Sequence, residues 1–122
     1  MIKDNLKKVF DELGIVISDN QINQFQRYYE ILIEVNKNMN LTAITEENDV
    51  ILKHFLDSIS IVLFKEFDFI NKVNKMDITS VIDIGTGAGF PGIPLNIMFP
   101  SLNITLVDSL NKRVNFLNTV ID

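Results

Sequence analysis

Residues 81–95 read VIDIGTGAGFPGIPL and hold four of the five glycines of the chain. The run before the glycines, Val81 to Ile84, is short, β-branched and apolar except for Asp83, a pattern typical of a buried parallel strand. Residues 93–99 predict the helix that follows. Glycines at alternate positions let a ligand approach the main chain, because no Cβ stands in the way. We therefore expect a ligand at this turn, with N–H groups pointing outward as donors for a carboxylate or a phosphate.

The dinucleotide fingerprint G-x-G-x-x-G is one candidate for this turn. Counted from Gly85, its third glycine would have to be residue 90, which is Phe90. Counted from Gly87 it matches through Gly92, but it then begins two residues late and carries a proline inside the turn. A nicotinamide site therefore has only a weak match, and a glycine turn with a purely structural role is a further alternative.

Asp83, two residues before Gly85, favours a different ligand. A carboxylate at the end of the strand can accept hydrogen bonds from an ammonium group, and it repels a pyrophosphate. S-adenosylmethionine (AdoMet) carries an ammonium and a sulfonium group but no phosphate. The pattern D-x-G-x-G-x-G over residues 83–89 resembles the first motif of the class I AdoMet-dependent methyltransferases, in which the acidic residue lies near the methionine amino group.

A second strand is predicted over residues 103–107, which alternate and are β-branched. It ends in Asp108, nineteen residues after Gly89, at the spacing where a nucleotide-binding βαβ unit places a carboxylate that holds the ribose hydroxyls. The alternative is that Asp108 or Ser109 is the N-cap of the next helix. Both roles are compatible with each other.

Three helices are predicted before the first strand. The first covers residues 5–13 and ends at Gly14, and the second begins with a capping box formed by Ser18 and Gln21. Residues 36–45 predict a loop, and Thr45 would cap the third helix. The core positions are predicted to be Ile22, Phe25, Tyr29, Leu32 and Ile33 in the second helix, and Val50, Ile51, Phe55, Ile59, Val62 and Leu63 in the third.

Composition excludes several kinds of protein. The 122 residues are enough for one modest domain, and no apolar run approaches the roughly 18 residues of a membrane span. The chain has no cysteine and one histidine, which excludes thiolate metal sites and disfavours zinc. Its net charge of -5 is the wrong sign for a chain that grips nucleic acid by itself, although Lys112 and Arg113 lie together after Asp108. We expect a cytoplasmic protein that binds no metal and no membrane.

Four blocks in this order and spacing resemble the RsmG (GidB) family: NLTAI at residues 40–44, HFLDS at 54–58, GTGAGFPGIPL at 85–95, and LVDS at 106–109 followed by KRV at 112–114. The likeness covers nearly the whole chain. Members of that family methylate N7 of a guanine in the 16S ribosomal RNA of the bacterial small subunit. The resemblance implies AdoMet as cofactor, and 16S ribosomal RNA or the small ribosomal subunit as partner.

The resemblance also implies site residues where the motif matches. The glycine turn would hold the methionine part of AdoMet, with one carboxylate at its amino group and another at its ribose. His54, Asp57 and Arg113 match family positions without a role that we can assign, and a lone histidine near a carboxylate on a helix is more often structural than an acid–base catalyst. The predicted cofactor-binding residues are Asp83, Gly85, Gly87, Gly89, Phe90 and Asp108.

The predicted fold class is α/β: a helical region over residues 1–78, then the first β-α-β part of a class I, Rossmann-like methyltransferase domain over residues 79–122. Only two strands are visible, so we expect a truncated domain with one sheet face and one edge uncovered, and self-association or marginal stability of the chain. Two rivals are left open: a nicotinamide-dependent oxidoreductase, and a non-catalytic interaction module in which the glycine turn is a relic.

Overall fold

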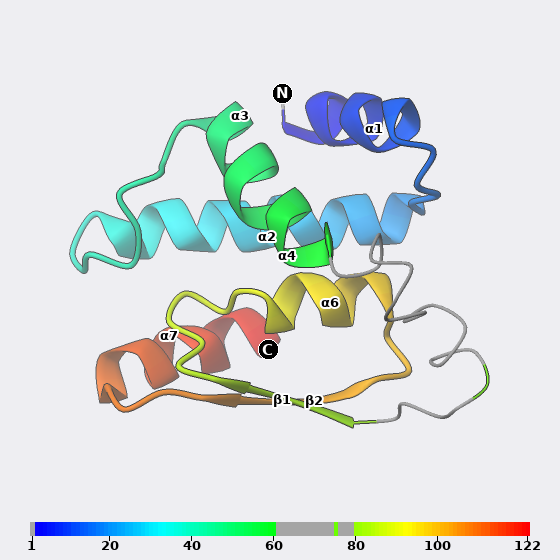
Figure 1. Cartoon of the computed structure of the whole chain (residues 1–122). Coiled ribbons are helices and arrows are strands. Elements are labelled where there is room, and N and C mark those ends of the chain that lie inside the picture. Colours follow the sequence, from blue (N-terminus) through cyan, green and yellow to red (C-terminus); the bar gives the residue numbers. More distant parts are fainter. Residues whose placement is uncertain (1, 61–74, 76–79) are drawn as a thin grey trace.

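The computed structural model describes residues 2–60, 75 and 80–122. Figure 1 shows three layers. A helical layer lies on one side, α6 and α7 lie in the middle, and a two-stranded sheet lies on the other side. The helical layer is formed by α1 (Ile2–Glu12), α2 (Asp19–Asn36), α3 (Glu47–Asp49), the π-helix η1 (Val50–Leu56) and α4 (Asp57–Ile59); the rest is β1 (Ser80–Ile84), α6 (Gly92–Met98), β2 (Asn103–Val107) and α7 (Asn111–Ile121).

The ends of α1 and α2 follow from local sequence signals. Gly14 has a φ of +69° just after α1, as expected of a helix that ends in a glycine. The capping box of α2 is confirmed, since the Ser18 hydroxyl accepts from the Gln21 N–H at 3.1 Å and the Gln21 side chain accepts from the Ser18 N–H at 2.9 Å. These contacts set the start of α2, and the Gln21 amide also donates to the carbonyls of Ile97 and Met98 in α6, at 3.1 and 3.4 Å.

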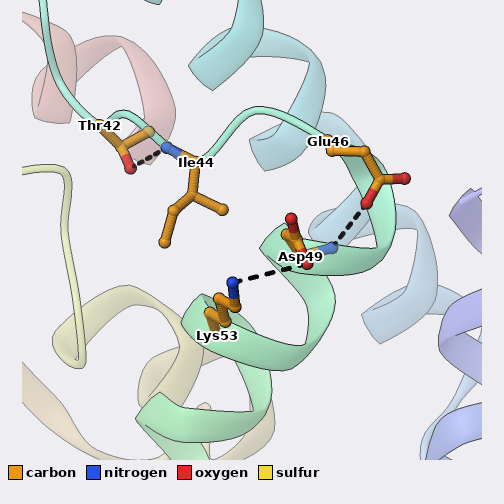
Figure 2. A network of polar contacts seen from close by, with 5 residues as sticks. All are labelled: Thr42, Ile44, Glu46, Asp49 and Lys53. Carbon is orange, nitrogen blue, oxygen red and sulfur yellow. Dashed lines mark hydrogen bonds and ion pairs between the residues drawn. The ribbon is translucent and has the colours of Figure 1, made fainter.

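The third helical run begins one residue later than predicted. Glu46, not Thr45, is its N-cap, because the Glu46 carboxylate accepts from the N–H of Asp49 at 3.2 Å. Figure 2 shows this bond beside the ion pair between Asp49 and Lys53, in which nitrogen and oxygen are 3.8 Å apart. The predicted core positions Val62 and Leu63 lie outside the described residues.

The two strands are parallel neighbours, as predicted. Ser80 pairs with Asn103 and Ile84 pairs with Val107, so the carboxyl ends of both strands meet at one edge. The connection between them contains the glycine turn (residues 85–92) and α6, which begins at the last glycine of the turn. The peptide bond between Phe90 and Pro91 is cis. This arrangement brings Asp83 and Asp108 to the same end of the sheet.

One hydrophobic core joins the helical layer to α6 and α7. Phe25 lies at its centre, with ring centroids 6.0 Å from Phe10 and 4.9 Å from Phe55. The predicted core of α2 needs two corrections: Tyr28 is 2% exposed whereas Tyr29 is only half-buried, and Ile33 is also only half-buried. Both tyrosines lie about one helical turn after Phe25, but the packed position of α2 turns Tyr28 toward Phe55 of η1 and Ala88 of the glycine turn.

One face of the sheet is uncovered. The prediction of a buried strand is therefore wrong for half of its positions, because Ile82 and Ile84 are 65% and 80% exposed and Val107 is 42% exposed. The alternate residues, Val81 and Asp83, face α6 and are half-buried. The predicted uncovered face is thus present in the part of the chain that the structure describes.

Candidate functional site

Asp83 closes the glycine turn at the carboxyl end of β1. Its Oδ2 accepts hydrogen bonds from the Thr86 hydroxyl at 2.6 Å and from the Gly92 N–H at 3.0 Å. The first bond holds the start of the turn, and the second holds the first residue of α6. Within the described residues Oδ1 accepts no hydrogen bond, so this oxygen is available to a ligand.

Asp108 holds the middle of the same turn from the end of β2. Its Oδ2 accepts from the Gly87 N–H at 2.9 Å, and its Oδ1 accepts from the Leu110 N–H at 3.0 Å and lies 3.5 Å from Nη1 of Arg113. The N–H groups of Leu110 and Gly87, with the guanidinium of Arg113, lower the pKa of Asp108 below its ordinary value of 3.8. The residue is therefore an anion at neutral pH.

Asp108 is not the N-cap of α7, which was the alternative reading of its position. The N-cap is Leu110, and no side chain caps it. Asp108 instead accepts from the N–H two residues on, a local turn that aspartate favours. Its side chain is 2% exposed, because it lies between the glycine turn and the start of α7.

Six of the seven N–H groups of the turn are used within the protein, and Ala88 is the exception among the described residues. Gly85 and Thr86 both donate to the carbonyl of Val107, at 2.8 and 3.0 Å. The carbonyl of Thr86 accepts from Gly89 and Phe90, at 3.0 and 3.2 Å. With the N–H groups bound by the two carboxylates, this overturns the expectation of outward-pointing donors, because backbone groups in a buried turn need partners. The turn offers carboxylates rather than donors, which favours a cationic ligand over a phosphate.

The four glycines of the turn fall into two pairs. A Cβ added to Gly85 or Gly87 would meet no heavy atom within 4 Å, so open space lies over these two positions. At Gly89 a Cβ would lie 2.8 Å from the Tyr28 hydroxyl, and at Gly92 it would clash with Leu106. The first pair therefore leaves room for a ligand, whereas the second pair lets the turn pack against its own supports.

Two aromatic residues of the helical layer support the turn. The buried hydroxyl of Tyr28 donates to the carbonyl of Ala88. The imidazole of His54 stacks on the ring of Phe90, with centroids 4.3 Å apart and planes 8° apart. Burial raises the pKa of Tyr28 well above its ordinary value, and the negative charge of Asp83 raises it further, so the hydroxyl keeps its proton.

The structure brings the six predicted cofactor-binding residues to one end of the sheet. Within the described residues, His54 makes no hydrogen bond with Asp57 that would support an acid–base role. The Nε2 of His54 lies 2.8 Å from the Thr42 hydroxyl instead. Burial lowers the pKa of His54, and Asp57 opposes that shift through its charge alone. The sequence reasoning overlooked Tyr28 and Thr86. Spacing could not have singled out Tyr28, because Tyr28 and Tyr29 lie three and four residues after Phe25 and both fall on its side of the helix.

A hollow of about 570 Å³ lies between α2, α6, β2 and α7. Tyr28, Ile93 and Leu106 are among its lining residues, and none of the six predicted cofactor-binding residues is. Among the described residues, no three histidine or acidic side chains form a group that could hold a metal ion. In the same part of the chain, no helix has the length and apolar character to cross a membrane.

Fold and site together define an α/β protein whose glycine turn lies between two carboxylates at the end of a parallel strand pair. The family model described as "GidB: rRNA small subunit methyltransferase G" matches residues 21–122. The chain therefore belongs to the rRNA small subunit methyltransferase G (GidB) family. This result confirms the family resemblance of the four sequence blocks.

Curated relatives agree with the family model. A ribosomal RNA small subunit methyltransferase G of Leuconostoc mesenteroides is 48% identical over 122 residues, which is 100% of this chain and 48% of that relative. Proteins of the same name from Leuconostoc citreum and Exiguobacterium sibiricum are 51% and 52% identical, over 92% and 88% of this chain and 44% and 42% of the relatives. The chain thus spans about half the length of the curated relatives that it matches.

Proposed function

We propose that this chain carries the methionine and ribose side of an AdoMet site, in an enzyme that methylates N7 of a guanine in 16S ribosomal RNA. The proposal includes a class I, Rossmann-like fold for residues 79–122, an N-terminal helical region over residues 1–78, and a cytoplasmic location. Membership of the family supports the reaction class. The observation that carries the cofactor assignment is the pair of carboxylates beside a turn whose donors are used internally.

The residues present fit AdoMet better than a dinucleotide. The Oδ1 of Asp83, which accepts no hydrogen bond within the described residues, would accept from the cofactor ammonium, and open space over Gly85 and Gly87 would admit the cofactor body. Gly87, Leu110 and Arg113 use three of the about four acceptor positions of the Asp108 carboxylate, which leaves one for a ribose hydroxyl. A pyrophosphate would meet two negative charges and few N–H donors here, which disfavours the nicotinamide-dependent oxidoreductase.

The chemistry of the proposed substrate agrees with a site that orients the reactants and contributes no general base. Guanine N7 has an in-plane lone pair and no proton to lose, so alignment matters more than a general base. When bound, AdoMet supplies an electrophilic methyl group on its sulfonium. The chain's own task is orientation: Asp83 holds the amino end, Asp108 the ribose, and Phe90 bounds the turn. We assign no catalytic residue.

Calorimetric titration of the 122-residue chain with AdoMet, and separately with NAD, tests this proposal. We expect AdoMet to bind and NAD not to bind. Asp83→Asn keeps an acceptor for Thr86 but removes the charge, and we expect it to weaken AdoMet binding by about tenfold or more, the usual effect of losing a charge-assisted hydrogen bond. The matched control is Asp11→Asn on the exposed side of α1. Binding of NAD, silence with both ligands, or an unchanged affinity in Asp83→Asn would each contradict the assignment.

A further inference from the structure

Two sequence blocks, residues 40–44 and 54–58, have no part in the proposed cofactor site, yet the structure joins them. The hydroxyl oxygen of Thr42 lies 2.8 Å from Nε2 of His54, across twelve residues of chain. The loop that carries Thr42 is itself fixed, because Oδ1 of Asn36 at the end of α2 accepts from the N–H groups of Leu41 and Thr42 at 2.9 and 3.0 Å. The two blocks therefore act as one unit on the imidazole.

The Thr42 hydroxyl has two partners. Its oxygen accepts from the Ile44 N–H at 3.0 Å, as Figure 2 shows. Its hydrogen is available to donate to Nε2 of His54, and a bond in that direction places the ring proton on Nδ1. Burial lowers the pKa of His54 and so favours this neutral ring.

The neutral ring of His54 sets the plane of Phe90. The angle between the His54 and Phe90 ring planes is 8°, whereas the rings of Tyr28 and Phe55 make interplanar angles of 39° and 49° with Phe90. Among the described residues, His54 is thus the one parallel contact of Phe90. A leucine could fill the same space, but it could not be held in one orientation by the Thr42 hydroxyl.

We propose that His54 is a positioning residue for the glycine turn: the Thr42 hydroxyl orients its ring, and the ring holds Phe90 in the place that AdoMet requires. This inference rests on the proposed function. It gives the loop before α3 a role in cofactor affinity, because that loop carries Thr42.

The test compares Thr42→Val, Thr42→Ser and a control, Thr119→Val, whose hydroxyl has one hydrogen bond within the described residues, to the Asn115 carbonyl on α7. Thr42→Val removes two hydrogen bonds, the one with His54 and the one from the Ile44 N–H. We expect it to weaken AdoMet binding about fivefold, because the His54 ring loses its partner, while Thr42→Ser and Thr119→Val stay within about twofold of the unchanged chain. Nitrogen-15 spectra of the His54 ring should show Nδ1 protonated in the unchanged chain and in Thr42→Ser, and a changed tautomer in Thr42→Val.

Calorimetry and urea unfolding are measured on the same samples, so that affinity is separated from stability. Loss of stability in Thr42→Val with unchanged AdoMet affinity would overturn the inference, as would a failure of Thr42→Ser to restore binding. If the unchanged chain takes up no AdoMet, the proposed function fails. The ring resonances of Phe90 then decide the positioning role, since they should shift in Thr42→Val and return in Thr42→Ser; no shift overturns it.

Discussion

The helical layer is held by apolar contacts between Phe10, Phe25 and Phe55, each completely buried. The glycine turn is held mainly by hydrogen bonds, with Asp83 at its start and end and Asp108 at its middle. Apolar packing depends on volume and tolerates small changes of angle, whereas each hydrogen bond requires one donor at one position. The helical layer is therefore a rigid support, and the two carboxylates define the shape of the turn.

The two regions meet at Tyr28, His54 and Phe90. Tyr28 and His54 belong to the helical layer by their backbone, but their polar atoms bond to Ala88 and Thr42. These contacts place polar supports inside an otherwise apolar interface. Substitutions at this junction and at the two carboxylates therefore test whether the two regions are stabilised in different ways.

The largest effect is expected from Gly89→Ala, which would press a methyl group against Tyr28 and Ile93 in a backbone with a φ of +100°. Overpacking and backbone strain together should lower the free energy of unfolding by about 3 kcal/mol. Gly87→Ala is the control, since it has a positive φ of +60°, in the left-handed helical region, and open space around its Cβ, and should cost only about 1 kcal/mol. Urea unfolding of both variants measures the difference, and equal losses would show that contact with the helical layer is unimportant.

An intermediate effect is expected from Tyr28→Phe, which leaves the buried carbonyl of Ala88 without its hydroxyl donor. The free energy of unfolding should fall by about 1–2 kcal/mol. Tyr29→Phe is matched to it, because the Tyr29 hydroxyl bonds to the exposed Thr45 carbonyl at 3.3 Å, and should change stability by less than about 0.5 kcal/mol. Thermal or urea unfolding measures both variants. Equal losses of stability would show that the Tyr28 hydroxyl does not support the turn.

The smallest effect is a pH dependence carried by Asp108. Its pKa is lowered mainly by the N–H groups of Leu110 and Gly87, so its ionised form stabilises the folded chain. This contribution is complete above the ordinary pKa of 3.8 and is lost as pH falls through the lower pKa of the folded state. Unfolding of the unchanged chain and of Asp108→Asn, from about pH 7 to about pH 2.5, should show a stability difference that shrinks only at the acid end. A difference that does not vary with pH would contradict this role.

Much of the site could be predicted because its signals are local. The strand, the glycine spacing and the capping box of Ser18 and Gln21 depend on neighbours within a few residues, and the structure has all three. The parallel strands then bring Asp83 and Asp108 together without further information. The cofactor-binding roles of these residues stay predictions, as does the division of the chain after residue 78, which lies outside the described residues.

Other features needed contacts between distant segments. The used N–H groups of the glycine turn depend on Val107 and Asp108, which lie about twenty residues further along the chain. The exposure of Ile82 and Ile84 depends on which sheet face α6 covers, and a β-branched pattern does not predict which face that is. Predictions based on nearby residues were wrong at these places.

The amino-acid sequence by itself determined the order of elements, the glycine turn, its two acidic neighbours and the family to which the chain belongs. These properties rest on backbone preferences and short-range hydrogen bonds, which act over a few residues. The pairing of Thr42 with His54, the stacking of His54 on Phe90 and the choice of Tyr28 over Tyr29 came only from the packed fold. Each of these depends on the rotation of one helix against another element, and that rotation is set by how the whole core packs.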